Sequence, residues 1–145
     1  MTITLTIPLV LLLIAAIDAF GDALRYRGYQ IWHLVEAVQI AGWFVFAGLF
    51  AADCMTSIVA NQSVMSIILS GWIYVLIYVL GRIWLFDLVY NLTAGKPILY
   101  VGKNDLFGKS VRWFAGIWPV SYSNVSFIVK FMALIGWVAL LLGYI

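Results

Sequence analysis

Four long apolar stretches occupy most of this chain, at residues 3–24, 31–52, 64–92 and 124–144. Each is about as long as, or longer than, the roughly 20 residues that an α-helix needs to cross about 30 Å of hydrocarbon. The composition agrees, because only 10% of the residues are charged, whereas an ordinary soluble domain has about 25%. The sequence therefore predicts an all-α integral membrane protein, a four-transmembrane-helix bundle that forms one polytopic domain over residues 1–145.

The first stretch is expected to remain in the protein as a transmembrane helix and not to be removed as a signal peptide. A signal peptide begins with basic residues and ends at a cleavage site of small residues. Here no Lys or Arg precedes the apolar run, and Asp18 and Asp22 occupy the place of the cleavage site. The short connection RYRGYQ predicts an antiparallel hairpin with the second stretch. Residues 53–63, which include the single cysteine Cys54, are expected to form a polar link to the third stretch.

Basic residues predict the orientation of the four helices. Arg25 and Arg27 lie in the first connection, and the third connection contains Lys96, Lys103, Lys109 and Arg112. The N-terminus, the second connection and the C-terminus contain no Lys or Arg. Lys and Arg in short loops stay on the cytoplasmic side. We therefore expect the first and third connections to be cytoplasmic and both termini to be non-cytoplasmic, in a bacterial inner membrane or an equivalent membrane.

The third connection contains a second helical pattern at residues 104–118. Its apolar residues recur at helical spacing and are Leu106, Phe107, Val111, Phe114, Ile117 and Trp118. Lys109 and Arg112 fall on the other side. This pattern predicts a short cytoplasmic interfacial helix between the third and fourth transmembrane helices, with its rings toward the hydrocarbon and its cations toward the headgroups. The alternative is an amphipathic connector that packs beneath the bundle.

Polar side chains recur at helical spacing near the cytoplasmic ends of three stretches. On the first stretch they are Asp18, Asp22 and Arg25, beside a stripe of small residues at Ala15, Ala19 and Ala23. On the second they are His33, Glu36 and Gln39, by steps of three. On the third they are Asp87 and Asn91, one turn apart, with Arg82 deeper and rotated away from them. All except Gln39 and Arg82 lie within about two or three turns of the same membrane face and are predicted to meet.

The side chains of this predicted pocket need partners, water or a ligand, because a charge in hydrocarbon costs about 2.5 to 3.5 kcal/mol on insertion scales. Carboxylates and imidazole are ligands for divalent cations. The sequence therefore predicts a partly acidic pocket that binds a cation, an anionic lipid headgroup or both. The expected metal ligands or acid–base catalytic groups are Asp18, Asp22, His33 and Glu36. The groups expected to complete the pocket or contact a headgroup are Arg25, Arg82, Asp87 and Asn91.

Several interpretations of this pocket stay open. A divalent cation as cofactor would allow metal-dependent chemistry on a lipid, and the same residues suit a proton or ion path in an oligomeric channel. The chain also suits a non-catalytic membrane subunit of a larger assembly. In a purely structural interpretation, the acidic residues pair between helices with Arg25, Arg27, Arg82 and Lys130. Expected partners are membrane lipids with anionic headgroups and a homo-oligomer or larger membrane complex, and no basic run suggests nucleic acid.

Overall fold

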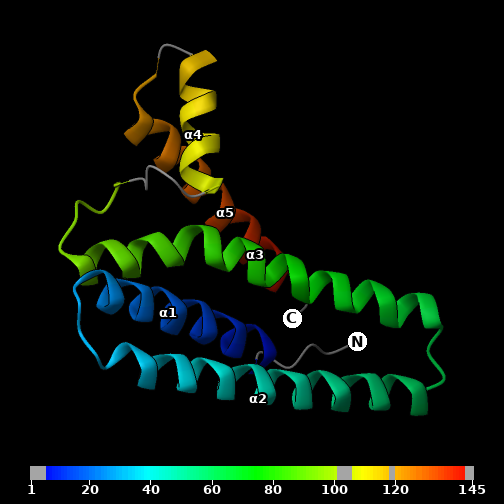
Figure 1. The fold of residues 1–145 in the computed structure, drawn as a ribbon. Helices are drawn as coiled ribbons and strands as arrows, with labels where there is room; N and C mark the ends of the chain where they lie inside the picture. The colour runs from blue at the N-terminus through cyan, green and yellow to red at the C-terminus, as the bar shows by residue number, and fades with distance from the viewer. Residues whose placement is uncertain (1–5, 101–105, 118–119, 143–145) are drawn as a thin grey trace.

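The computed structural model describes residues 6–100, 106–117 and 120–142, and most of them are helical (Figure 1). The helices are α1 (Thr6–Tyr26), α2 (Trp32–Val59), α3 (Val64–Ala94), α4 (Leu106–Ile117) and α5 (Tyr122–Leu142). Four of them, α1, α2, α3 and α5, are long and apolar enough to cross a membrane. The predicted all-helical class with four candidate spans is therefore confirmed, and no described residue lies in a strand.

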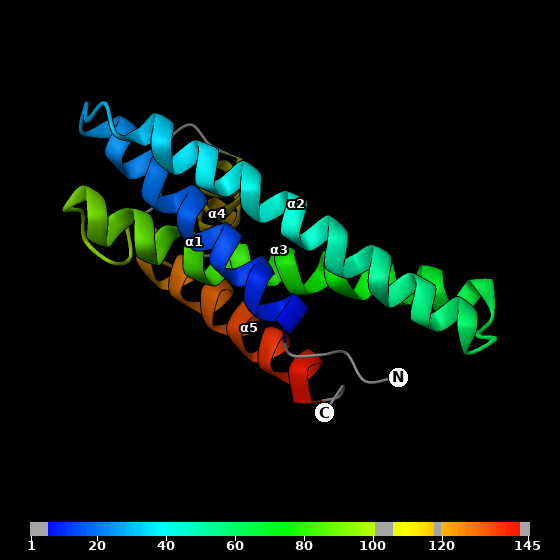
Figure 2. The same ribbon diagram turned by 90° about the horizontal axis from the view of Figure 1, so that it is seen from below.

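The four long helices pack in a series, in which α1 lies between α2 and α3 and α5 packs against α3. Figure 2 shows α2 and α5 on opposite sides of the molecule, with α1 between them. The predicted four-helix bundle is correct only in part, because the described helices do not close into a ring around one core. The α1–α2 connection and the chain after α3 lie at one end of the molecule, which we call the connection end, and the α2–α3 turn lies at the other (Figure 1).

Glycines in the left-handed conformation end two helices at the connection end. Gly28 (φ 76°) follows α1, and its N–H donates to the carbonyl oxygen of Arg25 (3.0 Å). Gly95 (φ 70°) follows α3, where the N–H of Lys96 donates to the carbonyl oxygen of Asn91 (2.8 Å). These hydrogen bonds satisfy carbonyl groups that the last helical turn leaves free. Both helices therefore end sharply, at the same end of the molecule.

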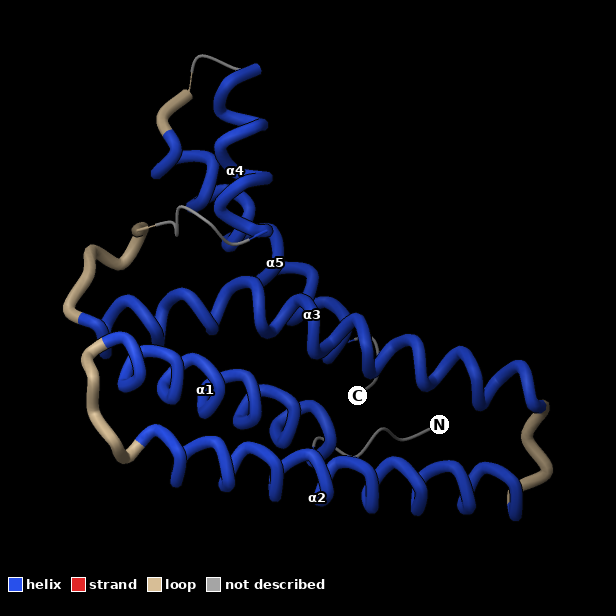
Figure 3. Tube along the Cα trace, viewed as in Figure 1, coloured by secondary structure: helices blue, strands red, loops and turns tan. Residues whose placement is uncertain are grey.

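The predicted polar link at residues 53–63 is wrong, because α2 continues to Val59. Figure 3 shows only a short loop between α2 and α3. Asp53 remains in the helix, and its Oδ2 accepts a hydrogen bond from Tyr74 Oη of α3 (2.9 Å). The segment contains no Gly or Pro that would break the helix before Asn61, which has a φ of 52°. The polar residues of this segment thus wrongly indicated a loop. The helix ends only near Asn61, a residue type that is suited to left-handed backbone.

The core lies where α1, α3 and α5 meet. Its buried side chains are Ile7, Leu11, Tyr74, Ile77 and Trp137. The small-residue stripe expected on α1 is fully buried, at Ala15, Ala19 and Ala23. Small side chains allow close helix approach. α2, by contrast, buries only Ser57. α1 is therefore the central helix, and its charged last turns lie against both α2 and α3.

The segment predicted to be interfacial forms α4, which runs across the direction of α1, α2 and α3 (Figure 1). α4 contacts α5. Val111 is buried, whereas Trp113, Phe114 and Ile117 are exposed. Outside the described part of the chain lie Trp118 and the side chains of Leu106 and Phe107. The structure thus confirms a helix in this segment that exposes aromatic side chains.

Candidate functional site

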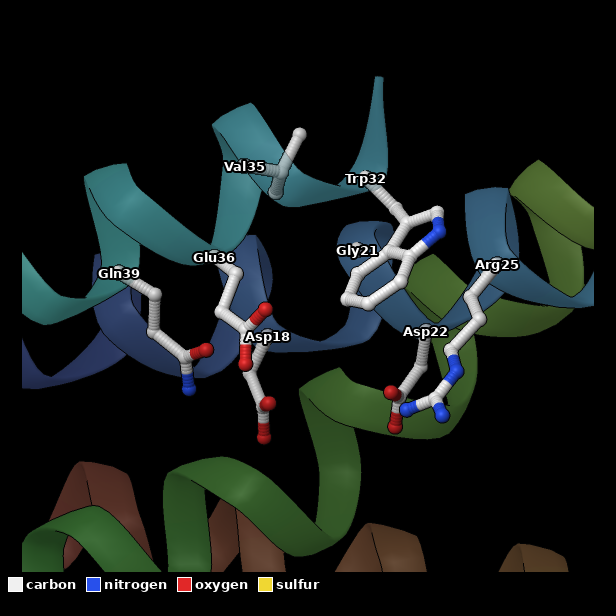
Figure 4. Close-up of a pocket in the computed structure, with 8 residues that line it drawn as sticks. All are labelled: Asp18, Gly21, Asp22, Arg25, Trp32, Val35, Glu36 and Gln39. Carbon is white, nitrogen blue, oxygen red and sulfur yellow. The ribbon is translucent and has the colours of Figure 1, made fainter. Parts of the chain in front are cut away.

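A pocket lies between α1 and α2 near the connection end (Figure 4). We call it the α1–α2 pocket, and it is lined by Asp18, Gly21, Asp22, Arg25, Trp32, Val35, Glu36 and Gln39. Its volume is about 80 Å³, which is room for several water molecules or a small polar group. Figure 4 shows the side chains of Asp18, Asp22, Glu36 and Gln39 pointing to the same side of the two helices.

Helical periodicity and one glycine bring the acidic residues of α1 and α2 together. Asp18 and Asp22 lie one turn apart on α1, as predicted, and Glu36 joins them from α2. The helices approach closely at Gly21, where an added Cβ would lie only 3.2 Å from Val35 Cγ1. A larger side chain at this position would press on Val35. Gly21 therefore allows the carboxylates of two helices to share one pocket.

Trp32 and Gln39 also line the pocket, although neither was predicted to be a site residue. With Glu36 they lie at i, i+4 and i+7 on α2, which is the spacing that the charged stripe on α1 follows. The predicted pocket instead grouped Glu36 with His33, because these two residues are spaced by three. The i, i+4, i+7 pattern is the signal that could have found Trp32.

Asp18 forms an ion pair with Arg82, so α3 also reaches the edge of the pocket. Arg82 Nη1 donates a hydrogen bond to Tyr78 Oη (3.1 Å), and its Cζ lies 4.5 Å from the centroid of the Phe86 ring. Arg82 is turned away from Asp87, as expected, because five residues correspond to about 140° around a helix. This rotation points Arg82 at α1, so Arg82 lies beside the acidic group although it is deeper and turned away from Asp87.

Trp32 contacts both Arg25 and His33 at the connection end. Arg25 Cζ lies 4.9 Å from the centroid of the Trp32 ring. The ring centroids of Trp32 and His33 are 3.5 Å apart. His33 is exposed and is not among the residues that line the α1–α2 pocket. The structure therefore places Arg25 in the pocket and His33 outside it.

Asp87 and Asn91 lie elsewhere on α3 and do not line the pocket. Asp87 Oδ2 is 3.0 Å from Lys130 Nζ of α5, and both side chains are largely buried. Asn91 is buried, and its Nδ2 donates hydrogen bonds to the carbonyl oxygens of Ile98 (3.0 Å) and Tyr100 (2.9 Å). Asp87 thus links α3 to α5, and Asn91 fixes the chain that follows α3. The convergence of both residues with the acidic group, which the sequence suggested, is not found.

The part of the chain that the structure describes contains no group of three or more His, Cys, Asp or Glu side chains that could hold a metal ion. Asp18, Asp22 and Glu36 share the pocket, but Asp18 is ion-paired and His33 lies outside. The structure therefore gives no support to the predicted metal site of Asp18, Asp22, His33 and Glu36.

The surroundings of Lys96, just after α3, were not expected from the sequence. Its Nζ lies 3.9, 4.9 and 4.6 Å from the ring centroids of Tyr26, Tyr90 and Tyr100, and it donates a hydrogen bond to Tyr90 Oη (3.2 Å). Partial burial lowers the pKa of Lys96, but the Tyr90 hydrogen bond and the nearby phenol groups outweigh it, so the pKa lies above its usual value. These contacts tie the ends of α1 and α3 together. No local spacing signals them, because the three tyrosines come from separate segments.

No protein-family model, curated protein or solved structure matches this chain.

Proposed function

We propose that this protein is an integral membrane protein whose α1–α2 pocket binds a positively charged group beside the phospholipid headgroups of the inner leaflet. The charge of the pocket carries the proposal. The pocket contains three carboxylates, Asp18, Asp22 and Glu36, and one cation, Arg25. Among ion pairs of the described residues, Asp18 is the only one of the three that takes part, and its partner is Arg82. The carboxylates outnumber the cations even when both arginines are counted, so the pocket attracts a cation.

Helix lengths support a pocket at the border of hydrocarbon and headgroups. α3 has 31 residues, or about 46 Å at 1.5 Å per residue, which exceeds the roughly 30 Å of a hydrocarbon core. Residues 64–81 carry no charge, whereas Arg82 and Asp87 follow them. The surplus length of α3 is therefore assigned to the connection end. On the other half of α2, Asp53 accepts a hydrogen bond from Tyr74, which partly satisfies that carboxylate.

The connection end is assigned to the cytoplasmic side. Arg25 in the last turn of α1, Arg27 in the α1–α2 connection and Lys96 after α3 all lie there. Basic residues in and beside short loops are retained in the cytoplasm. α4 is assigned to the interface of the same leaflet, because its exposed Trp113 and Phe114 suit the boundary between headgroups and hydrocarbon. The membrane is proposed to be a bacterial inner membrane or its equivalent.

Binding of ethylammonium chloride to the purified protein in detergent micelles tests the pocket. The unfolding temperature should rise with ethylammonium concentration above that in equal sodium chloride, because a ligand of the folded state stabilises it. Asp22→Asn and Glu36→Gln should abolish this rise. Asp53→Asn is the matched control, since it makes the same carboxylate-to-amide change on the other half of α2. A wild-type protein without a response, or a response that all three variants retain, contradicts the proposal.

The exposed surface of α2 favours a second candidate function, in which the protein is a subunit of a larger membrane assembly. Along α2 only Ser57 is buried. Four small residues lie within about 60° of one another around the exposed side of this helix, and they are Ala37, Ala41, Gly48 and Ala52. Small residues allow another transmembrane helix to approach closely. Gly48→Cys in a Cys54→Ser background should form a disulfide-linked dimer in oxidised membranes if a second copy packs there, and an uncrosslinked monomer would argue against it.

A further inference from the structure

We infer that the ligand of the α1–α2 pocket is the headgroup of an aminophospholipid, in which a phosphate ester carries a primary ammonium group. This inference rests on the proposed function, because it assigns a chemical class to the positive group that the pocket binds. Asp22 and Glu36 hold the ammonium group, and Arg82 holds the phosphate. The lipid enters from the surrounding leaflet, at the level where the pocket lies.

The ammonium half of the site consists of oxygen acceptors from two helices. Asp22 of α1 supplies one carboxylate, and Glu36 of α2 supplies another. These side chains point to the same side of the helix pair (Figure 4). Neither Asp22 nor Glu36 forms an ion pair with a described residue. A primary ammonium has three N–H donors, so it can hydrogen-bond to both carboxylates at once.

Arg82 supplies the phosphate half. Its hydrogen bonds to Asp18 and Tyr78 both use Nη1, whereas a guanidinium group has five N–H donors. The Arg82 side chain is 41% exposed, so its remaining donors are accessible. A guanidinium group binds phosphate well, because its planar fork matches two phosphate oxygens. Arg82 can therefore keep its ion pair with α1 and bind a phosphate at the same time.

The two halves follow one another along the helices in the same order as the charges of a phospholipid headgroup. The ion pair sets Arg82 at the level of Asp18. Asp22 lies one turn, about 6 Å, nearer the connection end. In a leaflet the phosphate lies nearer the acyl chains and the ammonium nearer the water. With the connection end in the cytoplasm, the phosphate reaches Arg82 while the ammonium reaches Asp22 and Glu36.

The charges of the pocket also distinguish among headgroups. Phosphocholine has a quaternary ammonium without N–H donors, so it cannot use the acceptors of Asp22 and Glu36. Phosphoglycerol has no positive charge and leaves both carboxylates unpaired. Phosphoethanolamine meets both requirements, and phosphoserine does so as well if its carboxylate contacts Arg25, which also lines the pocket. The pocket is therefore selective for a primary amine next to a phosphate.

Titration of the purified protein with short-chain phospholipids in detergent micelles tests the inference by native mass spectrometry. The aminophospholipid that binds best should bind about tenfold more tightly than phosphatidylcholine and phosphatidylglycerol, as expected for hydrogen bonds to charged groups. Glu36→Gln should abolish this preference, and Asp53→Asn should retain it. Arg82→Lys keeps a charge beside Asp18 but loses the fork, so it should weaken lipid binding and leave ethylammonium binding unchanged.

Each other result contradicts a defined part of the inference. Equal binding of all the phospholipids, with ethylammonium still stabilising the protein, overturns the headgroup assignment and leaves the cation pocket intact. Loss of both responses contradicts the proposed function as well. Water-soluble phosphoethanolamine that binds as tightly as the lipid would show that the ligand is not a lipid. An Arg82→Lys variant that loses ethylammonium and lipid binding to the same degree removes Arg82 from the phosphate half.

Discussion

α3 makes one ion pair on each of two faces, and the two pairs differ in their surroundings. Arg82 pairs with Asp18 of α1, whereas Asp87 pairs with Lys130 of α5. The Arg82 side chain is 41% exposed and that of Lys130 only 11%. The first pair borders the α1–α2 pocket, and the second lies enclosed between two helices. We call the Arg82–Asp18 pair the open contact and the Asp87–Lys130 pair the closed contact. The open contact leaves hydrogen-bond donors that a ligand can reach, whereas the closed contact only holds two helices together.

The closed contact is part of a buried face that extends along α5. Ser126, Lys130, Ala133 and Trp137 recur at helical spacing there and are all largely buried. From α3, Trp84 meets Trp137 edge to face, with their ring centroids 6.0 Å apart. Such aromatic pairs add stability beyond the area that they bury. Substitutions on this face should therefore change the free energy of unfolding more than they change ligand binding.

The largest effect on stability is expected from Lys130→Met. This change leaves the buried carboxylate of Asp87 without its cation, and loss of one partner from a buried ion pair costs about 3 to 5 kcal/mol. The free energy of unfolding, measured by denaturant titration in detergent micelles, should fall by about that amount. The double variant Asp87→Leu with Lys130→Met should recover most of the loss, since two apolar side chains leave no unpaired charge. An unchanged free energy in the single variant would show that the contact is not closed.

A smaller effect is expected from Gly81→Ala, at a point where both α1 and α5 lie close to α3. A Cβ at Gly81 would lie 3.0 Å from Leu12 Cδ2 of α1 and 3.3 Å from Trp137 Nε1 of α5. Because the added methyl is crowded from both sides, the free energy of unfolding should fall by about 1 to 2 kcal/mol. Gly48→Ala on α2 is the matched control, since a Cβ there meets no atom within 4 Å. Equal effects of the two substitutions would contradict the close packing at Gly81.

Arg82→Gln should destabilise the protein less than Lys130→Met. Its ion pair with Asp18 is partly exposed, and such contacts contribute about 1 kcal/mol or less. The same denaturant titration measures the loss, and the native mass spectra should show weaker aminophospholipid binding. Arg82→Lys controls for the charge that Asp18 requires. A loss of stability as large as that of Lys130→Met would show that both faces of α3 are closed contacts.

The helices and half of the pocket could be predicted from the sequence, because both depend on local periodicity. The spacing of Asp18 and Asp22, and the short connection to α2, were enough to place their carboxylates near Glu36. The partners of Arg82 and Lys96 could not be predicted in this way. Those partners depend on which helices are neighbours and on how far each helix is rotated about its axis. In the structure the helices pack in a series with α1 between α2 and α3, and not around one common core.

The smallest effect on stability is expected from Glu36→Gln, and this variant separates the two regions most clearly. Glu36 is exposed and forms no ion pair with a described residue, so the free energy of unfolding should change by no more than about 0.5 kcal/mol. Its carboxylate nevertheless lines the α1–α2 pocket, so the response to ethylammonium should disappear. Unfolding with and without ethylammonium measures both quantities on the same sample. A Glu36→Gln variant that loses as much stability as Lys130→Met would mean that the pocket carboxylates hold helices together, as Asp87 does, and have no role in binding.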